Sequence, residues 1–253
     1  MIGIGIIGYG YWGPNLARCV AEGEATRLAA IHDRDPAARA RATRRYPGVA
    51  DHGDVRDLLA DPSVDAVAIA TPVHTHHELA LAALRAGKHV LVEKPIASSA
   101  AEAHELVDEA ARRHLVLMVD HTFVYTPAVA RIGEVLASGD LGQLYYYDSL
   151  RVNLGLFQSD VNVIWDLAVH DLAIIDHLIG EEPLSVSAIA ARHVPGSPES
   201  QAFVTLGFAS GTVAHLNVNW LAPVKVRQTL IGGSRKMIVY DDLEPSEKIK
   251  IYD

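Results

Sequence analysis

The feature that most constrains this fold is a glycine-rich segment between a predicted strand and a predicted helix. The strand covers residues 2–7, the helix covers residues 15–22, and between them stands Gly8-Tyr9-Gly10-Tyr11-Trp12-Gly13. In such a segment the first glycine permits a tight turn, the second lets the backbone approach a pyrophosphate, and the third allows close helix–strand packing. The helix N-terminus then offers unpaired N–H groups and a positive dipole end to the phosphates. The segment therefore predicts the phosphate-binding turn of a dinucleotide site.

An acidic residue follows the second predicted strand at the spacing that such a site requires. Asp33 comes directly after residues 28–32, about 20 residues beyond Gly13. A carboxylate there accepts hydrogen bonds from a ribose 2′-hydroxyl and repels a 2′-phosphate, so it favours NAD over NADP. Arg34 could instead hold a 2′-phosphate or stack on adenine. Asp33 could also be a simple turn residue, but we interpret it as the ribose-binding acid.

Predicted strands and helices alternate through the first 120 residues. Residues 64–70, which are apolar except for Asp65, and residues 115–119 favour strands buried on both faces. Two capping boxes predict where helices start: Thr75 with Glu78, and Ser99 with Glu102. The alternation predicts an α/β domain over residues 1–120, with the doubly wound parallel sheet of a Rossmann domain.

One strand of this domain ends in a charged pair. Residues 90–92 run directly into Glu93, Lys94 and Pro95. In open α/β sheets the ligand crevice lies beyond the carboxyl ends of the strands, so the pair can face a ligand. Pro95 cannot donate to a sheet, so pairing ends there, and the Lys94–Pro95 bond has an accessible cis form. The alternative is an ordinary strand end with a solvated lysine.

Three histidines follow Thr71 and Pro72 at the end of another strand, namely His74, His76 and His77. Their spacing fits no zinc signature, so we expect no metal site. Because the cluster follows the carboxyl end of a strand, we expect a cofactor-side role for His76. We expect polar surface positions for the other two histidines.

The pattern changes after Asp120. Residues 127–138 and 165–179 predict helices, and the strands are predicted over residues 143–153, 184–192, 201–208, 212–220, 226–231 and 236–240. We therefore predict a second, α+β domain over residues 121–253 with a mostly antiparallel open sheet. Ile249 and Ile251 alternate with polar residues as in a strand, with no turn signal afterwards. We expect this domain to be incomplete at its C-terminus.

Asp166 and His170 lie four residues apart on the second predicted helix of this domain. Residues at i and i+4 share a helix face. An imidazole partnered by a carboxylate can act as a general base near neutral pH. The alternative is an N-terminal capping aspartate followed by a surface histidine.

Composition excludes several kinds of partner. The chain carries 31 acidic and 22 basic side chains, a net charge of −9, without a basic block, which argues against nucleic acid. Its one cysteine, Cys19, excludes an intrachain disulfide and a Cys-based zinc site and favours a reducing, cytoplasmic setting. No apolar run approaches the ~20 residues of a membrane helix, so we expect no membrane partner.

These features together resemble the Gfo/Idh/MocA family of oxidoreductases across essentially the whole chain. The matching pieces are Gly8-x-Gly10-x-x-Gly13, Asp33, Thr71-Pro72 with His76, residues 86–90 leading to Glu93-Lys94-Pro95, and Asp166-x-x-x-His170. The resemblance implies a cofactor site formed by residues 8–13 with Asp33, Arg34, Thr71, Pro72, His76, Glu93 and Lys94. In the family the lysine and the Asp-x-x-x-His pair meet over the nicotinamide, which implies catalytic roles for Lys94, Asp166 and His170. It also implies Arg151 and Asn153 near the substrate.

The resemblance implies an NAD-dependent oxidoreductase. Its hydride would pass between the nicotinamide and a secondary hydroxyl or keto group of a sugar, cyclitol or nucleotide-sugar. Residues 162–171 are similar to members associated with nucleotide-sugar pathways. His170 would be the base, oriented by Asp166, with Lys94 stabilising an alkoxide, although Lys94 and His170 could exchange roles. We also expect a homo-oligomer through the second-domain sheet.

Three other function classes fit the sequence less well. A non-catalytic NAD-binding sensor would use the same nucleotide domain but needs no Lys94, Asp166 and His170 together. A short-chain dehydrogenase needs a Tyr-x-x-x-Lys pair, which the sequence lacks. A zinc alcohol dehydrogenase is disfavoured by the single cysteine.

Overall fold

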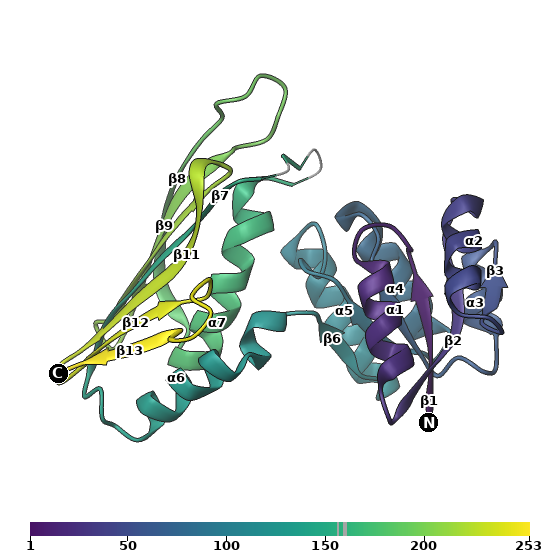
Figure 1. Ribbon diagram of the computed structural model, residues 1–253, viewed down its shortest axis with the longest axis horizontal. Helices are drawn as coiled ribbons and strands as arrows, with labels where there is room; N and C mark the ends of the chain where they lie inside the picture. Colours follow the sequence, from purple (N-terminus) through teal and green to yellow (C-terminus); the bar gives the residue numbers. More distant parts are fainter. Residues whose placement is uncertain (156, 159–160) are drawn as a thin grey trace. The chain divides into compact units, whose positions relative to one another are not determined.

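The computed structural model describes residues 1–155, 157–158 and 161–253. These residues form two compact units, Met1–Asp120 and His121–Asp253 (Figure 1). Each unit has a sheet and a hydrophobic core of its own.

The first unit is built on a six-stranded parallel sheet with the order β3-β2-β1-β4-β5-β6. Its strands are β1 Ile2–Ile7, β2 Thr26–His32, β3 Ala50–His52, β4 Ala66–Ile69, β5 His89–Val92 and β6 Leu117–Val119. Its helices are α1 Gly13–Glu22, α2 Pro36–Arg45, α3 Val55–Ala60, α4 His76–Arg85 and α5 Ala100–Arg113, with a 3₁₀ turn, η1, at Val73–Thr75. The predicted doubly wound sheet is therefore confirmed. Strand order reverses between β1 and β4, where ligands bind in such sheets.

Helices cover both faces of this sheet. Ile6 points to the side where α1 and α2 pack, whereas Ile7 points to the side where α3, α4 and α5 pack. Both side chains are at most 1% exposed. Successive strand residues point to opposite faces, so a strand buried on both sides has to be apolar throughout. This explains the continuous apolar runs of the sequence.

The second unit is built on a seven-stranded sheet with the order β13-β12-β11-β7-β10-β9-β8. Its strands are β7 Leu144–Leu154, β8 Pro183–Ala191, β9 Gln201–Phe208, β10 Val213–Asn219, β11 Leu221–Gly233, β12 Met237–Asp241 and β13 Ile249–Tyr252. Its helical segments are the 3₁₀ turn η2 Thr122–Tyr125, α6 Pro127–Ala137, the π-helical turn η3 Ile164–Ala168 and α7 Val169–Ile179. Among the described strands of this sheet, only β7 and β10 pair in parallel, which confirms the mostly antiparallel prediction.

Helices α6 and α7 pack on one face of this second sheet (Figure 1). Tyr147 and Ile231 point into that core and are 1% exposed. Their neighbours on the other face, which we call the open face, include exposed apolar side chains: Tyr146, Phe203, Val213, Leu230 and Met237. The Tyr146 ring lies so close to Gly232 that a Cβ there would be 2.1 Å from it. The Tyr146 ring thus covers the Gly232 backbone, which has no side chain of its own.

Three local predictions differ from the structure. The helix predicted over residues 165–179 begins as the π-helical turn η3 and becomes α-helical at Val169. The capping box at Thr75 is wrong, because the Thr75 hydroxyl lies 2.7 Å from Pro72 O and 2.7 Å from Thr71 Oγ1 and caps no helical amide. The strand predicted over residues 226–231 extends over Leu221–Gly233, because its pairing with β7 outlasts its apolar run.

Candidate functional site

In the glycine turn after β1, each of the three glycines has different surroundings. Gly8 has φ +94°, and a Cβ there would lie 2.6 Å from Ala70 O. A Cβ on Gly13 would lie 2.0 Å from Gly8 O. Gly10 has no atom within 4 Å of the position that a Cβ would take, so its backbone borders open space. The turn is therefore crowded from within and open at Gly10, as the approach of a phosphate requires.

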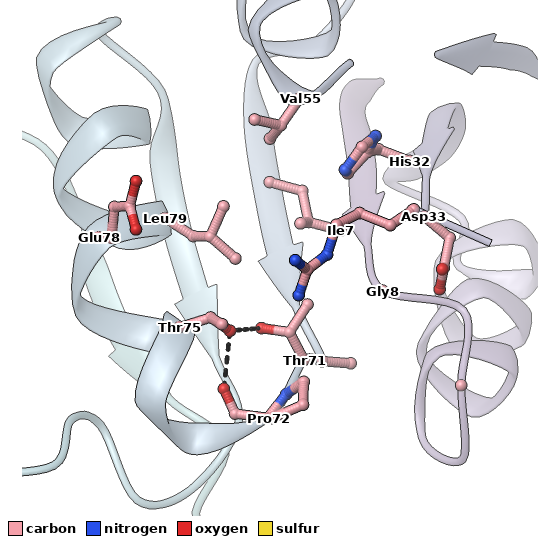
Figure 2. A pocket seen from close by; sticks show the side chains of 13 residues that line it. Ile7, Gly8, His32, Asp33, Val55, Thr71, Pro72, Thr75, Glu78 and Leu79 are labelled. Atoms are coloured by element: carbon pink, nitrogen blue, oxygen red, sulfur yellow. Dashed lines mark hydrogen bonds between the residues drawn. The ribbon is translucent and has the colours of Figure 1, made fainter. Parts of the chain in front are cut away.

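A cavity of about 340 Å³ lies beside this turn, at the carboxyl ends of β1, β2 and β4. Figure 2 shows Thr71, Pro72 and Thr75 together on one wall and Asp33 near Gly8 on the opposite side. The residues that line the cavity are Ile7, Gly8, Gly10, His32, Asp33, Arg34, Val55, Ala70, Thr71, Pro72, Thr75, Glu78 and Leu79. The cavity thus collects side chains from both sides of the point where strand order reverses.

The Asp33 carboxylate is held by two backbone amides. Tyr9 N donates to Oδ2 at 2.6 Å and Asp35 N donates to Oδ1 at 2.8 Å. An ionised carboxylate has about four acceptor positions, so capacity remains for sugar hydroxyls. The bond to Asp35 is that of a turn residue, and the bond to Tyr9 ties the acid to the glycine turn. Asp33 therefore fulfils its turn role and still lines the cavity.

The start of α1 completes a set of groups that fits a dinucleotide. Trp12 precedes the helix without a side-chain cap, and Pro14 occupies its first turn. The first N–H groups of such a helix attract an anion. The turn, the open backbone at Gly10 and the Asp33 carboxylate would hold a pyrophosphate and its ribose. Tyr11 and Trp12 are exposed beside the turn, with their rings edge to face at 5.8 Å.

His76, for which we expect a cofactor-side role, is a buried residue. Its side chain is 1% exposed and is not part of the cavity wall. Nδ1 lies 2.8 Å from Pro95 O and Nε2 lies 2.8 Å from Thr71 O. His77 instead contacts Glu105, with Nε2 2.9 Å from Oε2. The described residues contain no group of three or more His, Cys, Asp or Glu side chains placed to hold a metal ion.

The charged pair after β5 adjoins a second carboxyl group from the next strand. Glu93 is 9% exposed and shares a hydrogen bond with Asp120, which directly follows β6. Burial, followed by the charge of Asp120, raises the pKa of Glu93 to about 7. Lys94 follows Glu93, and the Lys94–Pro95 peptide is cis. An acid that titrates near neutrality therefore stands beside the candidate catalytic lysine.

Asp166 and His170 lie on consecutive turns, one on η3 and the other on α7. Trp220 Nε1 donates to Asp166 Oδ2 at 2.9 Å. The His170 ring packs edge to face against Phe123, with 4.8 Å between centroids. Each member of the pair is thus oriented by an aromatic residue far away in the sequence. Neither Trp220 nor Phe123 had a signal in the sequence that marked it for this role.

The structure places Arg151, which we expect near the substrate, in a buried ion pair. Its guanidinium is bidentate to Asp171, with 2.6 Å from Nε to Oδ2 and 3.2 Å from Nη2 to Oδ1. Arg151 is 5% exposed and Asp171 is 1% exposed. Ser149 Oγ also donates to Asp171, and the Phe123 ring lies 4.5 Å from the guanidinium carbon. The Arg151 guanidinium therefore contacts both the Asp171 carboxylate and the Phe123 ring within the second unit.

Asn153 lies two residues further along β7 and is half-buried. Its Oδ1 is buried and has no hydrogen-bond partner among the residues that the structure describes. An amide oxygen in that state can accept a hydrogen bond from a hydroxyl group. Both predicted substrate residues on β7 keep a polar atom without a hydrogen-bond partner in the described part of the chain, namely Asn153 Oδ1 and Arg151 Nη1, and of the two only the Asn153 atom is an acceptor.

Comparison with known families decides the identity of the fold. A family model described as "Oxidoreductase family, NAD-binding Rossmann fold" matches residues 2–121, and one described as "GFO/IDH/MocA C-terminal domain" matches residues 129–239. The chain belongs to the Gfo/Idh/MocA family. Its first unit is the NAD-binding domain of this oxidoreductase family, and its second unit carries the family's C-terminal domain.

Several relatives within the Gfo/Idh/MocA family carry names that describe a reaction. UDP-N-acetylglucosamine 3-dehydrogenase of Acidithiobacillus ferrooxidans is 35% identical over 219 residues, 84% of this chain and 65% of that protein. Inositol 2-dehydrogenase 2 of Saccharopolyspora erythraea is 35% identical over 194 residues, 75% of this chain and 57% of that protein. The chain thus spans about 57–65% of the length of these two relatives.

The crystal structure of GenD2 from gentamicin A biosynthesis, in complex with NAD, has the same fold. It is 25% identical, with a TM-score of 0.92 over 97% of this chain and 74% of that chain. Among the residues that the structure describes here, no helix is long and apolar enough to cross a membrane.

Proposed function

We propose that this chain is an NAD-dependent dehydrogenase or reductase that acts on a secondary hydroxyl or keto group of a sugar, cyclitol or nucleotide-sugar. The observation that carries the proposal is that Lys94 follows β5 at the carboxyl edge of the sheet that forms the NAD site. A nucleotide-binding domain that only senses NAD needs no lysine there. The names of the two relatives support the substrate class, because one acts on a UDP-sugar and the other on inositol.

The preferred cofactor in this proposal is NAD rather than NADP. Asp33 lines the cavity and carries a negative charge, which would repel a 2′-phosphate at short range. Arg34 lines the same cavity and is the residue that would favour NADP. The two hydrogen bonds to Asp33 hold its carboxylate in place, and this supports the NAD preference.

Oxidation of a hydroxyl group requires a proton acceptor and a cation near the reacting oxygen. Bound NAD supplies or accepts the hydride. We assign His170 as the base that takes the hydroxyl proton and Asp166 as the residue that orients it and binds a substrate hydroxyl. Lys94 stabilises the developing negative charge on the substrate oxygen. Asn153 Oδ1 is proposed to accept a hydrogen bond from another hydroxyl group.

Lys94 and His170 can also exchange these roles. In that case the Lys94 amine takes the hydroxyl proton and His170 stabilises the developing negative charge on the substrate oxygen. The pH–rate profile distinguishes the two roles.

The proposal extends to the assembly and its location. The open face of the second sheet exposes Tyr146, Phe203, Val213, Leu230 and Met237, and an apolar face of this kind suits self-association about a two-fold axis. The expected assembly is a homo-oligomer through this sheet. The single cysteine supports a cytoplasmic setting.

The test is a turnover screen of sugars, cyclitols and nucleotide-sugars with NAD and, separately, with NADP. Production of NADH with at least one compound from these classes is the expected result. Calorimetric titration with NAD is run in parallel. NAD binding without turnover of any compound would favour the NAD-binding sensor over the dehydrogenase. Light scattering of the same preparation measures the oligomeric state, and a monomer at all concentrations would contradict the proposed sheet contact.

A further inference from the structure

The two ring nitrogens of His76 both face carbonyl oxygens. Nδ1 is 2.8 Å from Pro95 O, and Nε2 is 2.8 Å from Thr71 O. The side chain is 1% exposed, so bulk water does not compete for these contacts. Both distances are those of good hydrogen bonds.

A backbone carbonyl oxygen accepts hydrogen bonds and never donates them. Neutral imidazole has one N–H group, so it can satisfy only one of the two carbonyl groups. The other contact would then place a nitrogen lone pair against an oxygen lone pair at 2.8 Å in a buried place. Imidazolium has two N–H groups and satisfies both carbonyl groups. The geometry therefore favours the doubly protonated ring.

The two carbonyl groups belong to the two turns that matter most in the first unit. Thr71 follows β4 and lines the cofactor cavity. Pro95 follows Lys94 after β5. His76 opens α4, between these two strands in the chain, and its ring spans from one turn to the other. A side chain so placed fixes the distance between the cavity wall and the backbone of the lysine.

We propose that His76 is a positioning residue whose imidazolium ties the turn after β4 to the turn after β5 and so holds Lys94 in register with the NAD site. The role of Lys94 in this inference rests on the proposed function. The protonated imidazole itself rests only on the contacts with Thr71 and Pro95.

Other titratable groups surround this position. His74 lies on η1, and His77 and Glu78 lie on α4 beside His76. Glu93 and Lys94 follow β5, which packs against α4, and Asp120 follows β6. Glu105 on α5 contacts His77 rather than the buried ring. The ionised carboxylates in this set favour a cation at His76, whereas burial of the ring and the Lys94 ammonium group oppose it.

The first experiment measures the protonation of the ring directly in the unmodified protein. Nitrogen-15 NMR of histidine-labelled protein distinguishes imidazolium from either neutral tautomer. We expect both nitrogens of His76 to carry protons at pH 7, with the assignment made by loss of the signal in His76→Gln. A neutral His76 ring at pH 7 would overturn the proposal. This measurement needs no substrate and no folded Ala variant.

The second experiment measures the positioning effect with a matched pair of variants. His76→Ala removes both carbonyl contacts, and His77→Ala removes the adjacent histidine, whose Nε2 lies 2.9 Å from the exposed Glu105 carboxylate. We expect His76→Ala to lose about 10²-fold in kcat, since small misplacements of a catalytic group cost that much. The dissociation constant for NAD should rise by less. His77→Ala should leave both unchanged.

Added imidazole supplies a readout that a general loss of stability would not move. We expect it to occupy the space left in His76→Ala and to restore part of kcat and of NAD affinity. Full activity of His76→Ala, or loss that imidazole does not restore although the variant melts like the parent, would overturn the positioning role. If the parent protein turns over no substrate, the proposed function fails. NMR and NAD affinity still test whether the His76 imidazolium joins the two turns.

Discussion

The backbone amide of Tyr9 donates a 2.6 Å hydrogen bond to Asp33 Oδ2. This bond joins the glycine turn after β1 to the acid after β2, two features that the sequence presents 24 residues apart. The position of the carboxylate is therefore set by the turn that would hold the pyrophosphate. Ribose recognition and phosphate recognition become parts of one rigid unit.

Asp33→Asn should shift the cofactor preference. The variant keeps one acceptor oxygen but loses the charge, and a hydrogen bond to a charged group contributes about 1.5–3 kcal/mol. We expect NAD affinity to fall by roughly tenfold or more and rejection of NADP to relax. Calorimetric titration with both cofactors checks this, with the exposed Asp57→Asn as control. Tighter NADP than NAD binding by the parent would contradict the prediction and give Arg34 the deciding role.

Gly10→Ala should separate cofactor binding from folding. A Cβ at this position meets no protein atom within 4 Å, so the melting temperature should stay within a few degrees of the parent. The methyl group would enter the space that a phosphate needs, so NAD affinity should fall about tenfold or more. Gly13→Ala is the contrasting variant, because its Cβ would lie 2.0 Å from Gly8 O and should destabilise the fold. Unchanged NAD binding by Gly10→Ala would place the phosphates elsewhere.

Glu93→Gln should remove a pH dependence of stability. Burial and Asp120 raise the pKa of Glu93 to about 7, so the folded state binds this proton more tightly than the unfolded chain does. Stability from this group is full below about pH 4.3, the unfolded value, and is lost as pH rises toward 7. The variant mimics the protonated form. It should gain on the order of 1 kcal/mol over the parent at pH 8 and nothing at pH 4.

Thermal unfolding of Glu93→Gln and the parent between pH 4 and pH 8 tests this expectation. Exposed Glu24→Gln is the control, and it should show no such difference between the two pH values. A parent whose stability rises between pH 4.5 and pH 7 relative to Glu93→Gln would mean that the carboxyl group is ionised and stabilised in the folded state.

Asp171→Ala should destabilise the second unit strongly. It leaves the Arg151 guanidinium buried without its carboxylate, and breaking a buried pair from one side costs about 3–5 kcal/mol. The exposed pair between Arg192 and Glu199 offers a matched control, because Glu199→Ala should cost at most about 1 kcal/mol. Denaturant unfolding of both variants measures the difference. Equal small losses would mean that water reaches Arg151.

Lys94→Ala and His170→Ala should each lose turnover by ~10²–10⁴ while NAD still binds. Lys250→Ala and His177→Ala change the same residue types at other positions and should keep the parent rate. The variant that lacks the true base should lose the acidic limb of the pH–rate profile. Near-normal turnover of both variants on the best substrate would remove the catalytic interpretation and favour the NAD-binding sensor.

The parts of the fold that the sequence predicted correctly depend on neighbours in the chain. The continuous apolar strands, the glycine turn and the strand–helix alternation are local patterns, and each one is satisfied by the two-sided burial of a parallel sheet. The cap at Thr75 failed for a local reason as well. A 3₁₀ turn precedes α4, and the hydroxyl group bonds back to that turn instead of forward to the helix.

The sequence by itself determined the NAD-binding domain, the type of the second sheet and the family, because hydrophobic period and glycine spacing are written along the chain. Only the tertiary structure decided what His76, Glu93 and Arg151 do. Their partners Pro95, Asp120 and Asp171 come from other elements, and His76 and Arg151 lie 19 and 20 residues from theirs. Buried polar groups must find partners wherever folding places them, since an unpaired one costs more than most single contacts contribute. Which groups meet is set by strand order and helix packing, and no spacing in the sequence records it.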